Sequence, residues 1–171
     1  GGEKLHMQSL CALGHYDFNS PGGYSYEQAF SVIRQLDMAN SQQALEEQYR
    51  RMVFNVVSRN QDDHTKNIAF LMNKKGQWFL SPAFDVCYSF NPTGDCTSTH
   101  QMSVNGKRDN FDINDLIDTG EHANLRKSKS KSIVKQVCES VSRWPLFAKE
   151  AGVSEKDIHR IKLAHRLSWD I

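Results

Sequence analysis

The feature that most constrains this chain is a run of eight polar residues, 60–67, enclosed between two apolar segments. The segment before it, roughly 40–58, repeats apolar residues at helical spacing and predicts a long core helix. The segment after it has two short apolar runs, 68–72 and 78–81, around a turn that contains glycine. This pattern predicts an antiparallel β-hairpin. The polar run is therefore fixed between a helix and a hairpin.

By composition alone, the polar run is an ordinary connecting loop. Its spacing favours a site. The catalytic loop of a protein kinase needs a carboxylate that accepts the proton of the substrate hydroxyl and, five residues later, a neutral oxygen ligand for Mg²⁺. Asp62 and Asn67 have this separation, and Asp63 does not. The spacing therefore selects Asp62 as the candidate base.

A second carboxylate ligand for the metal is expected after the hairpin. If the turn lies at 73–77, Ile68 pairs with Pro82, and Asp85 emerges beside Asn67. Magnesium prefers a few hard oxygen ligands and shares the remaining positions with phosphates and water. Asn67, Asp85 and a triphosphate satisfy this preference.

The segment departs from the commonest kinase pattern in three ways. His64 stands two residues after Asp62, where most protein kinases carry lysine. Asp85 lies in Phe-Asp-Val rather than Asp-Phe-Gly, and no His-Arg pair precedes Asp62.

Taken together, Asp-x-His-x-Lys-Asn at 62–67, a short hairpin, and Leu-Ser-Pro-Ala-Phe-Asp at 80–85 resemble the C-terminal domain of HipA-type toxin kinases. Segments 4–11 and 102–107 also resemble that family, so the likeness covers nearly the whole chain. Phosphatidylinositol-type lipid kinases share a similar but weaker Asp-x-His-x-x-Asn pattern.

The resemblance implies a Mg²⁺- and ATP-dependent serine/threonine kinase that is the toxin of a bacterial toxin–antitoxin pair linked to persistence. By position, Asp62 resembles the catalytic base, and Asn67 and Asp85 resemble the metal ligands. Phe84 resembles a residue beside the nucleotide. The loop along the nucleotide phosphates is matched by His64, Thr65 and Lys66.

The resemblance also implies partners. These are a helix-turn-helix antitoxin of the HipB type, operator DNA reached through the antitoxin complex, and a protein substrate such as an aminoacyl-tRNA synthetase. No apolar run approaches the length that spans a bilayer. We therefore expect a cytoplasmic bacterial protein that joins the nucleoid with its antitoxin.

The expected fold is mainly α-helical with a small β-hairpin, and residues 1–171 form a single kinase-type C-terminal lobe. Further helices are expected at 25–36, 112–118, 130–142 and after Ser154, with one or two helical turns within 5–13. The glycine-rich loop, strand lysine and hinge of an N-terminal lobe have no counterpart here. We therefore expect little kinase activity from this chain alone.

A basic run at 126–131 is either a solvated loop or helix start, or a contact to the DNA backbone. The net charge of +1 argues against a protein whose whole surface is positive enough to attract nucleic acid. The four scattered cysteines are read as reduced thiols, and the histidines other than His64 as ordinary surface or half-buried residues. The four candidate DNA contacts are Arg126, Lys127, Lys129 and Lys131.

Two other functions stay open. One is a metal-dependent phosphohydrolase that uses Asp62, Asp63 and His64 as a metal cluster, although consecutive loop residues do not all point at one metal. The other is a non-catalytic pseudokinase or regulatory module that binds antitoxin and DNA.

Overall fold

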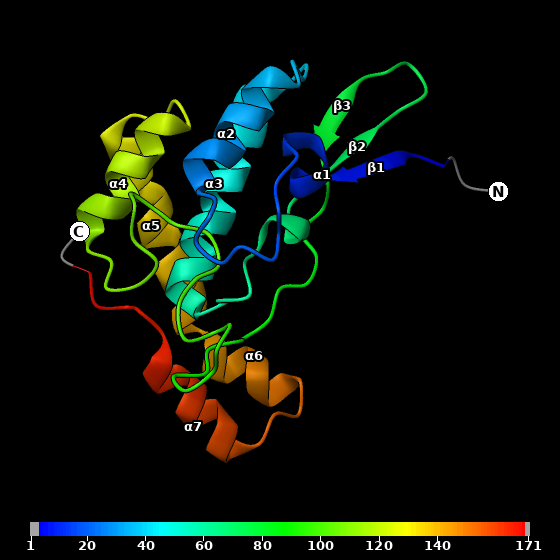
Figure 1. Ribbon diagram of the computed structural model, residues 1–171. Helices are drawn as coiled ribbons and strands as arrows, with labels where there is room; N and C mark the ends of the chain where they lie inside the picture. The colour runs from blue at the N-terminus through cyan, green and yellow to red at the C-terminus, as the bar shows by residue number, and fades with distance from the viewer. Residues whose placement is uncertain (1–3, 170–171) are drawn as a thin grey trace.

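A computed structural model of the protein describes residues 4–169 and shows a helical body with one small sheet at its side (Figure 1). The expected mainly helical fold is confirmed. Helix α3 is central: α2 packs on one side of it and α5 on another, while α4 packs on α5 and α6 pairs with α7. The helices are α1 Leu10–Gly14, α2 Tyr26–Gln35, α3 Ser41–Ser58, α4 Ile113–His122, α5 Lys127–Ser142, α6 Trp144–Glu150 and α7 Glu155–Ala164.

Helix α3 has the predicted bounds because its apolar positions recur on one face. Leu45, Tyr49 and Met52 are essentially inaccessible to solvent. The Tyr49 hydroxyl donates to the carbonyl of Leu116 at 2.9 Å and thereby ties α3 to α4. The helix ends where Arg59 adopts a left-handed conformation, with φ of 62°. This turn directs the chain into the polar segment.

Helix ends follow the predicted capping residues. Ser25 and Gln28 form the reciprocal capping box at the start of α2, and Ser154 caps α7 by accepting from the Asp157 amide. Helix α4 runs four residues beyond the expected end, and α5 starts three residues before the expected start. Helix α6 was not predicted.

The sheet has three antiparallel strands, β1 His6–Ser9, β2 Ala69–Met72 and β3 Trp78–Leu80. Met72 pairs with Trp78, so the predicted hairpin is confirmed. The expectation of helical turns across 5–13 was wrong for its first half, which pairs with β2 as β1. Strand pairing between segments about sixty residues apart is a tertiary choice that local periodicity does not reveal. Within residues 4–169, no helix is both long and apolar enough to cross a membrane.

Candidate active site

The polar segment 60–67 is held in shape by its own side chains and by Ser89 in the irregular segment that follows the hairpin. Asn67 donates from its side-chain amide to the backbone carbonyl of Asp62 at 2.9 Å and closes the loop across five residues. The hydroxyl of Ser89 accepts from the backbone amides of Gln61 and Asp62, at 2.7 and 2.9 Å. These bonds leave the Asp62 side chain outside the loop, where 43% of its surface is exposed.

A cleft of about 280 Å³ opens between this loop, helix α3 and the segment that follows the hairpin. Four of the predicted site residues line it together: His64, Asn67, Phe84 and Asp85. Asp85 has a φ of 52°, which is unusual for a residue that is not glycine. Backbone strain of this kind is concentrated at functional sites.

Asp62 does not itself line this cleft, but its carboxylate lies beside His64, which does. Partial burial raises the pKa of the Cys87 thiol, and the negative charges of Asp85 and then Asp62 raise it further. Both carboxylates therefore lie within electrostatic reach of one sulfur atom. His64 Nε2 is 3.7 Å from an Asp62 carboxylate oxygen, which places the imidazole between the loop and the cleft.

The chemistry of the donor set fits a hard cation. Asn67 uses its amide nitrogen within the loop, and among the described residues no group donates to its amide oxygen. Asp85 adds a carboxylate to the same cleft. Two buried polar atoms of the loop, His64 Nδ1 and Thr65 Oγ1, have no hydrogen-bond partner within residues 4–169. Unpaired buried polar atoms are costly unless a ligand or water meets them.

The remaining predicted loop residues are placed differently. Thr65 is buried beneath the loop, whereas Lys66 is exposed. The Lys66 ammonium lies 3.3 Å from the centre of the Phe18 ring, so the segment before α2 covers this side of the loop.

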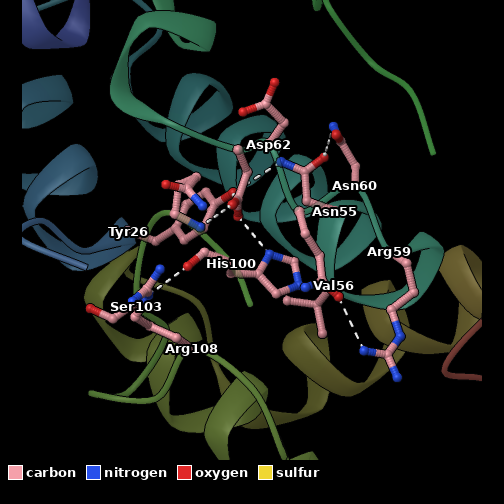
Figure 2. A network of polar contacts seen from close by, with 12 residues as sticks. Tyr26, Asn55, Val56, Arg59, Asn60, Asp62, His100, Ser103 and Arg108 are labelled. Carbon is pink, nitrogen blue, oxygen red and sulfur yellow. Dashed lines mark hydrogen bonds and ion pairs between the residues drawn. The ribbon is translucent and has the colours of Figure 1, made fainter. Parts of the chain in front are cut away.

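Asp63 points into the protein core, opposite to Asp62. Its carboxylate accepts from the Tyr26 hydroxyl at 2.7 Å, from His100 Nδ1 at 2.8 Å and from the Gln101 amide at 2.8 Å. Burial alone raises the pKa of Asp63, but His100, Tyr26 and the Gln101 amide outweigh it and lower the pKa below its usual value. Figure 2 shows His100 within this network and the Asp62 side chain directed away from it.

His100 extends the network to the far side of the core. Its Nε2 lies 3.1 Å from a guanidinium nitrogen of Arg166, which also donates to the Val56 carbonyl at 2.8 Å. Because a guanidinium only donates, Nε2 is the acceptor and Nδ1 carries the proton given to Asp63. Arg166 also pairs with Asp109. The polar segment is thus anchored to α3 and to residue 166.

Two expectations are corrected here. The reading of the other histidines as surface or half-buried residues was wrong for His100, which has no exposed surface. The proposed metal cluster of Asp62, Asp63 and His64 is not formed, because Asp63 faces the core. Within residues 4–169 no three His, Cys, Asp or Glu side chains are arranged to share a metal ion.

Reasoning from the sequence missed His100, Ser89 and Arg166 because each acts on the loop from a distant part of the chain. One signal could have pointed to His100: it stands just before the segment 102–107, which resembles the HipA family.

The basic run 126–131 does not line the cleft. It lies at the start of α5. Arg126 is the N-cap residue, and the three lysines follow within the first turns of the helix. Lys127 pairs with Asp118 and Glu121 at 3.6 and 3.4 Å, and Lys129 pairs with Glu46 at 2.8 Å.

Comparison with known proteins agrees with these features. Residues 2–144 match the family described as the HipA-like C-terminal domain. A solved structure of the toxin–antitoxin proteins HipA and HipB of Shewanella oneidensis MR-1 with operator DNA contains a similar chain, with a TM-score of 0.74 and 19% sequence identity. The match covers 94% of this chain and 42% of that one. Comparison with curated proteins gave no match. The family match covers most of the sequence, and the chain belongs to the HipA-like C-terminal domain family.

Proposed function

We propose that this chain carries the phosphoryl-transfer residues of a Mg²⁺- and ATP-dependent serine/threonine protein kinase that acts as the toxin of a toxin–antitoxin system. The observation that supports this most directly is the shared cleft of Asn67 and Asp85, with Asp62 beside His64, which also lines it. Phosphoryl transfer to a hydroxyl needs a base and oxygen ligands for the metal, and Asp62, Asn67 and Asp85 are residues of these types.

In this proposal each residue has one task. Asp62 accepts the proton of the substrate serine or threonine, and its exposed carboxylate is free for that contact. Asn67 and Asp85 would hold Mg²⁺, which when bound neutralises charge on the nucleotide phosphates. The hydrogen bond from the Asn67 side-chain amide to the Asp62 backbone carbonyl keeps the base and the metal ligand at a fixed separation.

The chain spans 42% of the length of the solved structure that it matches. A kinase also needs groups that cradle the nucleotide phosphates and grip the adenine. We propose that these come from outside residues 1–171, so activity is expected of the full-length gene product and not of this chain alone.

We further propose that the partners are those suggested by that structure, a HipB-like helix-turn-helix antitoxin and operator DNA. The substrate is then a protein of the translation machinery, such as an aminoacyl-tRNA synthetase, and the protein acts in the bacterial cytoplasm and at the nucleoid.

The test is phosphoryl transfer by the full-length gene product with Mg²⁺-ATP, followed by intact mass and by labelled phosphate. Asp62→Asn should lower kcat by about 10²- to 10⁴-fold, the usual contribution of a positioned base. The matched control is Asp95→Asn, an exposed aspartate in the loop beyond the cleft. Asp85→Asn should instead raise the Mg²⁺ concentration needed for activity. Unchanged kinase activity in Asp62→Asn would refute the proposal that Asp62 is the base.

A further inference from the structure

A second hollow lies beside the cleft, on the side of α6 and α7. It has a volume of about 260 Å³ and is formed between the end of α3, the segment after Asp85, and helices α5, α6 and α7. We call it the α6–α7 hollow. Its walls are mainly apolar, and six of the residues that form them are Phe54, Val86, Cys87, Trp144, Phe147 and Ile161.

The hollow is continuous with the candidate active site. Phe54 and Val86 line both the cleft and the hollow, so the two share a wall. Cys87 lines the hollow directly after Val86, one of the two residues that the cavities share. A polypeptide bound in the cleft therefore has the hollow directly beside it.

The hollow is open and apolar at its rim. Val86 is 48% exposed and Phe147 is 44% exposed, although both are large apolar side chains. Exposed apolar surface gathered around a concavity marks a contact for another molecule. A volume of about 260 Å³ with mainly apolar walls suits a single large apolar side chain.

We infer that the α6–α7 hollow receives a large apolar side chain of the protein substrate, next to the serine or threonine that is phosphorylated. This inference rests on the proposed kinase function. It assigns the substrate class: a polypeptide with an aromatic or large aliphatic residue within a few positions of the phosphoacceptor. Phosphoryl transfer itself uses the cleft lined by Asn67 and Asp85, and the hollow supplies selectivity.

The first test measures binding without catalysis. The probes are alanine-rich peptides with one serine and a single phenylalanine, placed from two residues before to three residues after the serine. An all-alanine version is the reference. The readout is the rate of Cys87 alkylation in the full-length protein, resolved by peptide mapping. Cys96, a second exposed free thiol away from the hollow, is the internal control.

At least one phenylalanine peptide should protect Cys87 and leave Cys96 unaffected. It should bind about tenfold or more tightly than the alanine peptide, as burial of one aromatic side chain predicts. The same peptide should be phosphorylated with a correspondingly higher kcat/KM.

The second test fills the hollow. Ser140 is an exposed residue of α5 at its edge, and Ser140→Trp should reduce binding of the phenylalanine peptide to that of the alanine peptide. Ser132→Trp places the same side chain at an exposed position of α5 outside the hollow and should change nothing.

The outcomes separate the two proposals. If Cys87 is protected but no phosphate is transferred, the kinase proposal fails and the hollow remains a peptide-binding site. If phosphate is transferred but no peptide protects Cys87, or Ser140→Trp and Ser132→Trp behave alike, the inference about the hollow is wrong.

Discussion

His100 Nδ1 lies 2.8 Å from a carboxylate oxygen of Asp63, and neither side chain has more than 1% of its surface exposed. This contact joins the polar loop to a segment almost forty residues later. It separates two adjacent aspartates by function, because Asp63 anchors the loop from inside, while Figure 2 shows Asp62 facing outward. The loop that carries the candidate base is therefore supported from the core.

Loss of the Asp63 carboxylate should destabilise the protein strongly. Asp63→Ala leaves the Tyr26 hydroxyl, His100 and the Gln101 amide without their acceptor. A buried donor left without its acceptor costs about 1–3 kcal/mol, and because three donors lose theirs, we expect a loss of at least that size in the free energy of unfolding. Denaturant unfolding measures it. Asp95→Ala at the exposed loop position should cost little, and an equal loss in both variants would contradict the anchoring role.

The same carboxylate should give the protein a particular acid sensitivity. Because the folded-state pKa of Asp63 is lowered, its contribution to stability is present above the unfolded pKa of about 3.9 and is lost as the pH falls through the folded-state value. The free energy of unfolding should thus fall more steeply below about pH 4 in the natural protein than in Asp63→Asn. Asp95→Asn is the control and should keep the natural slope.

Close packing of α4 on α5 depends on Gly120. A Cβ atom at this position would lie 2.1 Å from the Ser130 hydroxyl oxygen and 3.3 Å from the Tyr49 ring. Gly120→Ala should therefore lower the free energy of unfolding by about 1–3 kcal/mol, the usual cost of overpacking. Asp118→Ala, on the exposed side of α4, should change it by no more than about 0.5 kcal/mol. Thermal unfolding of the two variants distinguishes these values. Equal Tm shifts would show that the contact between α4 and α5 accommodates a methyl group at position 120.

Binding to operator DNA through an antitoxin complex should depend on the free cations of α5. Arg126 and Lys131 have no acidic partner within residues 4–169, whereas Lys127 and Lys129 do. If both free cations contact phosphates, Arg126→Ala with Lys131→Ala should reduce the salt dependence of binding by roughly two phosphate contacts. Lys74→Ala with Lys75→Ala, two exposed cations of the hairpin turn, is the matched control. If the two double variants show the same salt dependence of DNA binding, the basic run does not contact DNA and is only a solvated surface.

Much of the fold follows from local pattern. The bounds of α3, the β2–β3 hairpin and the caps at Ser25 and Ser154 depend on neighbouring residues, and all were predicted. Strand β1 was missed because its partner lies about sixty residues away, and α6 because it is short and follows α5 without a loop.

The candidate site divides in the same way. The separation of Asp62 from Asn67 is readable in the sequence, and the hairpin register predicts that Asp85 returns to Asn67. The anchoring groups are not readable, because Ser89, His100 and Arg166 reach the loop through tertiary contacts alone. Their residue types are ordinary elsewhere in proteins.

The contact between Arg166 and the Val56 carbonyl joins positions that are 110 residues apart. During synthesis, the polar loop therefore leaves the ribosome long before the arginine that fixes the end of α3 behind it. A nascent chain that stops short of residue 166 contains every candidate catalytic residue but lacks this clamp. The order of translation thus delays a fully supported site until nearly all of these residues have been made.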